Sequence, residues 1–200
     1  MFISLEGVDG SGKSTQARLL VEALGAETVA IREPGGTDAA ERIRDLLADP
    51  AVALEPLAEL LLFLAARADL TERVIRPALE AGRTVVSDRF SDSSVAYQGA
   101  ARGLGVGEVI GLCDTATDGL WPDLTLLLKV EPELSLGRAD GKDRFESEGV
   151  ELQRAVARAY EEIAIIASDR VVVIDADGTV DEVHERVMEA VSERRSRPEH

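Results

Sequence analysis

The sequence predicts an α/β protein, a three-layer sandwich in which a five-stranded parallel sheet is flanked by helices. Two observations carry this prediction. Short runs that are apolar almost throughout alternate along the chain with segments whose apolar residues recur at helical spacing. A glycine-rich loop separates the first apolar run from the first helical segment. Because we find no internal repeat and no linker, we expect residues 1–200 to form a single domain.

Five segments are predicted to be strands because they show almost no alternation between polar and apolar residues. A strand that helices cover on both faces has this pattern, whereas a strand with one face in water alternates. Strands that alternate with helices along the chain are expected to pair in parallel. The predicted strands are Phe2–Glu6, Thr28–Arg32, Thr84–Ser87, Leu124–Val130 and Val171–Ile174.

Helical segments fill the intervals between these strands. In the first of them, the leucines and the valine of residues 19–24 fall at helical spacing. The tail, residues 193–200, has no apolar face and is predicted to be disordered. The predicted helices span residues 13–24, 38–48, 55–80, 91–101, 105–118, 132–139, 150–167 and 179–194.

The loop after the first strand matches the phosphate-binding pattern G-x-x-x-x-G-K-[ST]. Its glycines let backbone N–H groups converge on phosphate oxygens, and the following helix adds the partial positive charge of its N-terminus. Lys13 is placed to reach the β- and γ-phosphates, and the Ser14 hydroxyl is placed to bind Mg²⁺. The sequence therefore predicts a P-loop NTPase fold and a nucleoside triphosphate ligand, held by Gly7, Val8, Asp9, Gly10, Ser11, Gly12, Lys13, Ser14 and Thr15.

The charge balance excludes several classes of partner. The chain has 38 acidic and 22 basic residues and a formal net charge of −16, so its surface repels nucleic acid and anionic lipid. The longest apolar stretch, residues 57–70, is interrupted by Glu59, Arg67 and Asp69, and no leader is visible. A single cysteine allows no internal disulfide. We therefore expect a cytoplasmic protein without a nucleic-acid or membrane partner.

A tight turn, Arg32-Glu33-Pro34-Gly35-Gly36-Thr37, follows the second predicted strand. Its Pro-Gly-Gly step can bring the backbone close to a ligand, and Arg32 and Glu33 flank it with opposite charges. Taken alone, the pattern favours a purely structural turn over a ligand-binding one.

Opposite charges also follow the third predicted strand, in Asp88-Arg89-Phe90. Asp88 is well placed to hold Mg²⁺ beside the phosphate loop, because ligands of parallel sheets bind at the carboxyl ends of the strands. Arg89 could donate two parallel hydrogen bonds to a phosphate. The alternative is a local ion pair that orders the turn.

The predicted helix 55–80 carries Phe63 and Arg67 four residues apart, on one face. A phenylalanine beside an arginine could cover a planar base, the ring by stacking and the guanidinium by donating hydrogen bonds. Alternatively, Phe63 belongs to the apolar core.

A cluster of cations, Arg138, Lys142 and Arg144, lies between two predicted helices. Phosphoryl transfer needs positive charge on the migrating group and the exclusion of water, which suggests a short mobile lid over residues 138–146. A solvated loop is the alternative.

Taken together, these segments resemble the bacterial thymidylate kinases, which phosphorylate dTMP to dTDP with ATP. The phosphate loop alone is shared by many kinases, whereas the other shared segments are more restrictive. The resemblance implies Mg²⁺ as the cofactor of ATP and a homodimer. It is carried by the motif Glu6–Thr15, by Arg32–Thr37, by Asp88–Phe90 with Asp92–Gly99, and by Trp121–Thr125.

The resemblance also implies a role for each matching residue. Phe63 would stack on thymine, and Arg67 would hydrogen-bond to the edge of the base. Arg44 and Arg89 would hold the phosphate of dTMP, and Tyr97 would lie against the sugar where a 2′-hydroxyl would project. The implied dTMP-binding residues are Asp9, Glu33, Arg44, Phe63, Arg67, Arg89, Ser93, Ser94, Tyr97 and Gln98.

The implied catalytic residues are Lys13, Asp9, Arg89 and Arg138. Asp9 would contact the sugar side of dTMP or orient a phosphate-binding arginine, and Asp88 would act with Ser14 around Mg²⁺. ATP would also contact Arg138, Lys142 and Arg144.

Two departures from the family pattern stand out. Gly10 follows Asp9 where an arginine would supply the catalytic cation in one branch of the family, so the lid must supply it here, with Arg138 favoured over Lys142 and Arg144. Phe90 replaces the more usual tyrosine, which leaves the Asp-Arg chemistry intact.

Three other functions are alternatives to this one. A kinase for a different nucleoside monophosphate would use the same scaffold. A GTP-dependent switch is disfavoured because the Asn-Lys-x-Asp element that reads guanine is missing; the chain contains no asparagine. A non-catalytic nucleotide-binding protein is disfavoured because every expected class of site residue is present.

Overall fold

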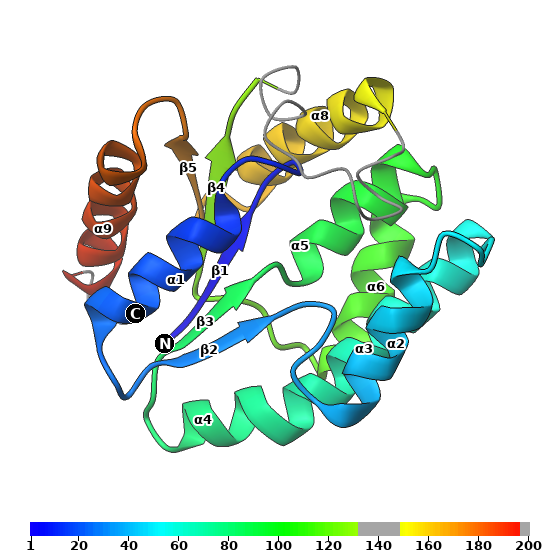
Figure 1. Cartoon of the computed structure of the whole chain (residues 1–200), viewed down its shortest axis with the longest axis horizontal. Helices are drawn as coiled ribbons and strands as arrows, with labels where there is room; N and C mark the ends of the chain where they lie inside the picture. Colours follow the sequence, from blue (N-terminus) through cyan, green and yellow to red (C-terminus); the bar gives the residue numbers. More distant parts are fainter. Residues whose placement is uncertain (132–148, 197–200) are drawn as a thin grey trace.

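The computed structural model describes residues 1–131 and 149–196. Its five strands form one parallel sheet in the order β2-β3-β1-β4-β5 (Figure 1). Each strand agrees with its predicted range to within one residue at either end. The predicted parallel sheet is therefore confirmed, with strands β1 (Phe2–Glu6), β2 (Val29–Arg32), β3 (Val85–Asp88), β4 (Leu124–Lys129) and β5 (Val171–Asp175).

Helices cover both faces of this sheet. The helices α1 and α9 pack against one face, while α3, α6 and α8 lie on the other (Figure 1). The described helices are α1 (Lys13–Leu24), α2 (Asp38–Ala48), α3 (Pro56–Leu70), α4 (Arg76–Glu80), α5 (Ser91–Ser94), α6 (Val106–Thr117), α8 (Val150–Ile166) and α9 (Val180–Ser196), with π-helical turns η1 (Thr71–Ile75) and η2 (Val95–Ala101). The helix expected at 132–139 lies outside the described residues.

The segment predicted as one helix over 55–80 is instead three consecutive pieces, α3, η1 and α4. Pro77 lacks a backbone N–H and its ring crowds the carbonyl one turn earlier, which disturbs regular α-helical bonding. The wider π turn, Thr71–Ile75, lies immediately before this proline region. In the same way, the predicted helix 91–101 begins as α5 and continues as η2.

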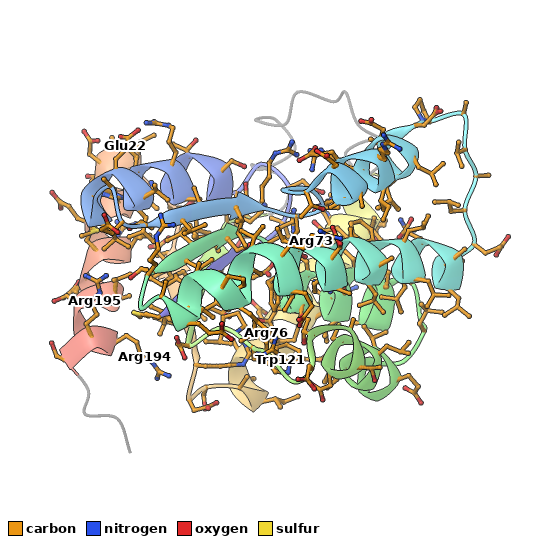
Figure 2. All side chains as sticks on the ribbon, turned by 90° about the horizontal axis from the view of Figure 1, so that it is seen from below. Glu22, Arg73, Arg76, Trp121, Arg194 and Arg195 are labelled. Carbon is orange, nitrogen blue, oxygen red and sulfur yellow. The ribbon has the colours of Figure 1, made fainter. Side chains whose placement is uncertain are left out.

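The prediction of a disordered tail was wrong for residues 193–196, because α9 continues to Ser196. The helix buries Val187 and Val191 on its inner side, and Arg194 donates a hydrogen bond of 2.8 Å to the carbonyl of Asp169. Arg194 and Arg195 project from the last turns of α9 (Figure 2). The helix therefore continues past its last buried residue, Val191, and the polar composition of residues 193–196 does not end it.

No described helix is long and apolar enough to cross a bilayer.

The sheet order places three loops side by side. Because β1 lies between β3 and β4, and β3 lies beside β2, the loops after β1, β2 and β3 emerge together from the carboxyl edge of the sheet. Backbone hydrogen bonds continue beyond the strands, from Glu33 N–H to the Asp88 carbonyl (3.0 Å) and from Arg89 N–H to the Leu5 carbonyl (3.1 Å). The edge contact of Phe2 with Phe90, at 4.8 Å between ring centroids, anchors the chain just after Arg89 in the core.

Candidate functional site

A cavity of about 300 Å³ opens at this carboxyl edge. Its lining comes from the phosphate loop, from the ends of β2 and β3, and from α2, α3, α5 and η2. Every residue that the resemblance implied for dTMP binding lies in this lining. They are Asp9, Glu33, Arg44, Phe63, Arg67, Arg89, Ser93, Ser94, Tyr97 and Gln98, joined by Gly10, Lys13, Ser14 and Asp88 from the predicted nucleotide side.

The phosphate loop has the backbone that its glycines allow. Gly7 has φ of +143°, and a Cβ atom there would lie 2.5 Å from the carbonyl oxygen of Leu128. Gly12, with φ of +92°, leads directly into α1. A side chain at Gly7 would therefore push the loop away from β4, which explains the glycine at that position.

Lys13 is buried within this loop. Its Nζ donates hydrogen bonds to the Val8 carbonyl (2.8 Å) and to Ser11 Oγ (3.4 Å). Burial, together with the neighbouring charge of Arg89, lowers the pKa of Lys13 to about 8. An approaching polyphosphate would favour the charged ammonium, so this lysine is poised to bind an anion.

Ser14 and Asp88 meet at the mouth of the cavity, where the Ser14 hydroxyl donates a hydrogen bond to the Asp88 carboxylate. Hydroxyl and carboxylate oxygens are ligands that suit Mg²⁺, which commonly takes few protein ligands and completes its shell with phosphates and water. No cluster of three or more acidic, histidine or cysteine side chains suited to a metal occurs within residues 1–131 and 149–196. The pair therefore fits a cation that arrives with a nucleotide.

Arg89 occupies the centre of the site with its backbone in the left-handed region, at φ of +73°. Its guanidinium forms an ion pair with Asp9 and donates to the carbonyl of Gly7 (3.2 Å) and to the hydroxyl of Tyr97 (3.3 Å). It also lies 5.1 Å from the centre of the Tyr97 ring. A non-glycine residue in this conformation is uncommon and is held by surrounding contacts.

Asp9 is held as an anion by its surroundings. Burial would raise the pKa of Asp9, but the positive charges of Arg89 and Lys13 outweigh burial and lower it. The Tyr97 hydroxyl donates to the same carboxylate at 3.2 Å. The ionised carboxylate therefore orients the guanidinium beside the phosphate loop.

Arg67 is fully buried, and its guanidinium donates hydrogen bonds to residues from three different parts of the chain. Its Nε donates to Glu33 Oε2 (2.7 Å), Nη1 to Ser94 Oγ (3.0 Å) and Nη2 to the Phe90 carbonyl (3.2 Å). Glu33 Oε1, by contrast, is buried without a hydrogen-bond partner in the described structure. Burial raises the pKa of Glu33, against the opposing effect of the Arg67 charge. A buried polar oxygen without a partner at a cavity wall points to an interaction with a ligand.

The remaining lining residues frame the opening. Phe63 is half-buried and belongs to neither apolar core cluster of the described residues, so the reading of Phe63 as core is not supported. Arg44 donates a hydrogen bond of 3.0 Å to the carbonyl of Pro34, and the peptide bond between Glu33 and Pro34 is cis. Gln98 donates to the buried carboxylate of Glu59 at 2.8 Å.

Sequence reasoning missed two site residues on α8, Gln153 and Tyr160. Gln153 forms two hydrogen bonds with Asp9: its Nε2 donates to Oδ2 (2.8 Å) and its Oε1 accepts from the backbone N–H (3.2 Å). Tyr160 donates to Glu6 at 2.7 Å. The available signal was two polar residues seven positions apart on a helix face that is otherwise formed by Val156, Ala159 and Ile163.

Glu6 is the last residue of β1, a strand that is buried throughout, and the sequence predicted no role for it beyond the opening motif. Burial, reinforced by the negative charge of Asp92, raises the pKa of Glu6 from its ordinary value of 4.5 to about 7. The charge of Arg89 and hydrogen bonds from Ser93 and Tyr160 oppose this increase. Near neutral pH the ionised and the protonated forms of Glu6 are therefore both populated.

This pKa predicts how stability depends on pH. Because the folded pKa lies above the unfolded one, the folded state binds more protons between pH 4.5 and 7, and the Glu6 contribution to stability is lost as pH rises through that window. Glu6→Gln cannot titrate and so lacks this contribution. The free energy of unfolding of the variant minus that of the wild type should therefore increase by about 3 kcal/mol from pH 4.5 to pH 8. Urea unfolding of both proteins at several pH values measures the difference, and parallel profiles would contradict the raised pKa.

The expected lid cations Arg138, Lys142 and Arg144 lie outside the described residues. Their assignment to ATP and to the transferring group therefore remains a prediction.

Comparison with known proteins agrees with this geometry. A sequence model of the thymidylate kinase family matches residues 5–187. The chain is similar to a thymidylate kinase from Synechococcus sp. (strain JA-2-3B'a(2-13)), with 47% identity over 97% of this chain and 95% of the relative, and to one from Deinococcus radiodurans, with 44% identity over 97% of both. It also resembles the crystal structure of thymidylate kinase from Ehrlichia chaffeensis, with a TM-score of 0.79 and 34% identity over 96% of this chain and 98% of the other. The chain belongs to the thymidylate kinase family.

Proposed function

We propose that this protein transfers the γ-phosphoryl group of ATP to dTMP, forming dTDP and ADP, in the cytoplasm. Membership of the thymidylate kinase family supports the reaction. The observation that carries the proposal is the position of the cavity. It joins the phosphate-loop residues Lys13 and Ser14 to a wall with an aromatic ring, Phe63, and two largely buried arginines, Arg67 and Arg89. This is the arrangement that a donor triphosphate and an acceptor nucleotide need in order to meet.

On the acceptor side, Phe63 stacks on thymine and Arg67 donates to the edge of the base. Fixed contacts to Glu33, Ser94 and the backbone hold the Arg67 guanidinium in one orientation, which favours a single geometry of recognition. Ser94 acts through Arg67, because its hydroxyl accepts a hydrogen bond from that side chain. Gln98 lines the same wall while bonded to Glu59.

The acceptor phosphate lies against Arg89 and Arg44. Both side chains line the cavity, and Arg89 is the closer to the phosphate loop through its ion pair with Asp9. Tyr97, whose hydroxyl lies between Arg89 and Asp9, packs against the sugar. Arginine suits this task because its planar fork can donate two parallel hydrogen bonds to a phosphate.

On the donor side, the phosphate loop binds the triphosphate and Lys13 neutralises charge on its outer phosphates. Ser14 and Asp88 are the residues that would hold Mg²⁺, which would supply further neutralisation of the phosphate oxygens. No side chain has to remove a proton from the acceptor, because the second pKa of a phosphate monoester is about 6 and the oxygen is largely ionised at neutral pH. The task of the protein is therefore alignment, charge neutralisation and exclusion of water.

A panel of acceptors tests this proposal. We expect ADP release with ATP and Mg²⁺ to be fastest with dTMP and slow with dCMP, AMP and GMP. dUMP lacks only one methyl group, worth about 1–3 kcal/mol, so it should be used at a reduced rate. Faster turnover of another monophosphate would identify a kinase with a different acceptor, and equal ADP release without any acceptor would contradict the kinase assignment.

We further propose that the protein forms a homodimer. Leu57 and Leu61 lie one turn apart on α3 and are about half exposed, at 51% and 49%. Large exposed apolar side chains at adjacent positions of one helix are typical of an interface. Light scattering coupled to size-exclusion chromatography should give twice the chain mass of 21.4 kDa, and a monomer at micromolar concentration would contradict the proposal.

A further inference from the structure

Beneath Arg89 lies a group of three side chains, Glu6, Ser93 and Tyr160, which we call the Glu6 cluster. Glu6 Oε2 accepts hydrogen bonds from the Ser93 hydroxyl (2.6 Å) and the Tyr160 hydroxyl (2.7 Å). Glu6 Oε1 accepts from the backbone N–H of Phe90 at 2.7 Å. All of these partners are donors, so the cluster satisfies the ionised carboxylate, the form that predominates above pH 7, and these hydrogen bonds oppose the effect of burial on the pKa of Glu6.

The same two hydroxyl groups face Arg89 on their other side. Arg89 Nη1 lies 3.0 Å from Ser93 Oγ and 3.4 Å from Tyr160 Oη, and donates to both. The two hydroxyl oxygens also lie 3.0 Å from each other, but each hydroxyl group has one proton, and that proton is directed at Glu6 when the carboxylate is ionised. The hydroxyl oxygens are therefore left to accept from the guanidinium, and the hydrogen bonds run in one direction from cation to anion.

These contacts restrict how Arg89 can present itself to a ligand. Nη1 is held by the Glu6 cluster and by the Gly7 carbonyl, and Nη2 by Asp9 and Tyr97. With both Nη groups fixed, the plane of the guanidinium is set. Its Nε–H has no acceptor among the described residues, so that edge is available to the cavity.

We propose that Glu6 and Tyr160 are positioning residues for the acceptor phosphate, because they hold the guanidinium of Arg89 in its binding orientation through the Tyr160 and Ser93 hydroxyl groups. The inference rests on the proposed function, in which Arg89 binds the phosphate of dTMP. Neither residue touches the nucleotide. Their effect is therefore confined to a ligand whose phosphate binds Arg89, which is dTMP and neither thymidine nor ATP.

Two substitutions separate this role from general support of the fold. Tyr160→Phe keeps the buried ring and removes only the hydroxyl. Glu6→Gln keeps the shape but replaces one acceptor oxygen by an amide NH2 group. That group then faces either the two hydroxyl groups or the Phe90 N–H, and in both orientations a donor is set against a donor. Thr117→Val is the matched control: its hydroxyl is also buried, donates to the carbonyls of Cys113 and Leu120, and lies outside the cavity lining.

Isothermal titration of each purified variant with dTMP, with thymidine and with ATP provides the test. Thymidine has the base and the sugar but no phosphate. We expect Tyr160→Phe to weaken dTMP binding about tenfold and Glu6→Gln by at least as much, with thymidine and ATP affinities within about twofold of wild type. Thr117→Val should change none of the three affinities. In steady-state kinetics Tyr160→Phe should raise KM for dTMP and leave KM for ATP unchanged.

Arg89→Ala completes the design. If the hydroxyl of Tyr160 acts through Arg89, Tyr160→Phe should have no further effect on dTMP affinity once Arg89 is alanine. If Tyr160→Phe weakens dTMP and thymidine equally, or weakens neither, the positioning inference is wrong. If Arg89→Ala itself leaves dTMP affinity unchanged, the phosphate assignment in the proposed function is wrong. Tyr160→Phe decides the question even where Glu6→Gln fails to fold.

Discussion

Lys13→Ala is expected to lower kcat with ATP and dTMP by at least about 10²–10³-fold. Lys13 is buried inside the phosphate loop, and no other lysine or arginine lies in that loop, residues 7–15. Alanine removes the charge that neutralises the outer phosphates, and water in the loop would be a poor substitute because it is neither charged nor fixed. Initial rates of ADP release at saturating dTMP and ATP measure the effect.

The Lys13 side chain also supports the loop, because its Nζ bonds to the carbonyl of Val8. Lys13→Met, which keeps most of the length of the side chain without the charge, therefore accompanies the alanine variant. Arg18→Ala is the control, since Arg18 lies on the same helix, is exposed, and forms a surface ion pair with Glu22. Retention of kcat within tenfold by both Lys13 variants would mean that this loop does not bind the donor.

The second large effect is expected from Arg89→Ala, which should lower kcat/KM for dTMP by about 10²–10³-fold. Truncating one member of a largely buried, hydrogen-bonded charge pair costs about 2–5 kcal/mol, partly because the other member is left unpaired. Here the residue left behind is Asp9, whose carboxylate would then face the incoming phosphate with like charge. KM for dTMP should therefore rise steeply, while KM for ATP changes much less.

Arg76→Ala provides the comparison for Arg89. Arg76 is also partly buried and donates hydrogen bonds to the carbonyls of Thr117 and Asp118, but it is not among the residues that line the cavity. Its replacement should reduce thermal stability without changing KM for dTMP. An Arg89→Ala enzyme with normal kinetics toward dTMP would show that a different cation binds the acceptor phosphate.

The local parts of the structure could be predicted because short segments encode them. A strand covered on both faces is apolar throughout, so the ranges of β1 to β5 follow from the sequence to within a residue. The phosphate loop is also local, since its glycines, Lys13 and Ser14 are consecutive and their geometry depends on the adjoining strand and helix. The π-helical turns η1 and η2 were not predicted, because no simple periodicity signals them.

The contacts that orient the site could not be predicted from segments. Gln153 bonds to Asp9 across 144 positions, and Tyr160 bonds to Glu6 across 154. In the sequence, Gln153 and Tyr160 are each a single polar residue on an amphipathic helix. Nothing in the neighbouring residues identifies the side chain to which either one bonds. The choice between core and site for Phe63 was likewise open in the sequence. In the structure Phe63 lines the cavity and belongs to neither apolar core cluster of the described residues.

The amino-acid sequence by itself determined the parallel sheet, the phosphate loop and the kinds of side chain available at the ends of the strands. Those features depend on periodicity and on neighbours within one turn or one loop. Only the tertiary structure decided which buried carboxylate faces which arginine, and so placed Asp9 and Glu6 on two sides of Arg89. The reason is physical: a buried charge is stable only beside a partner, and that partner is brought by packing from distant parts of the chain.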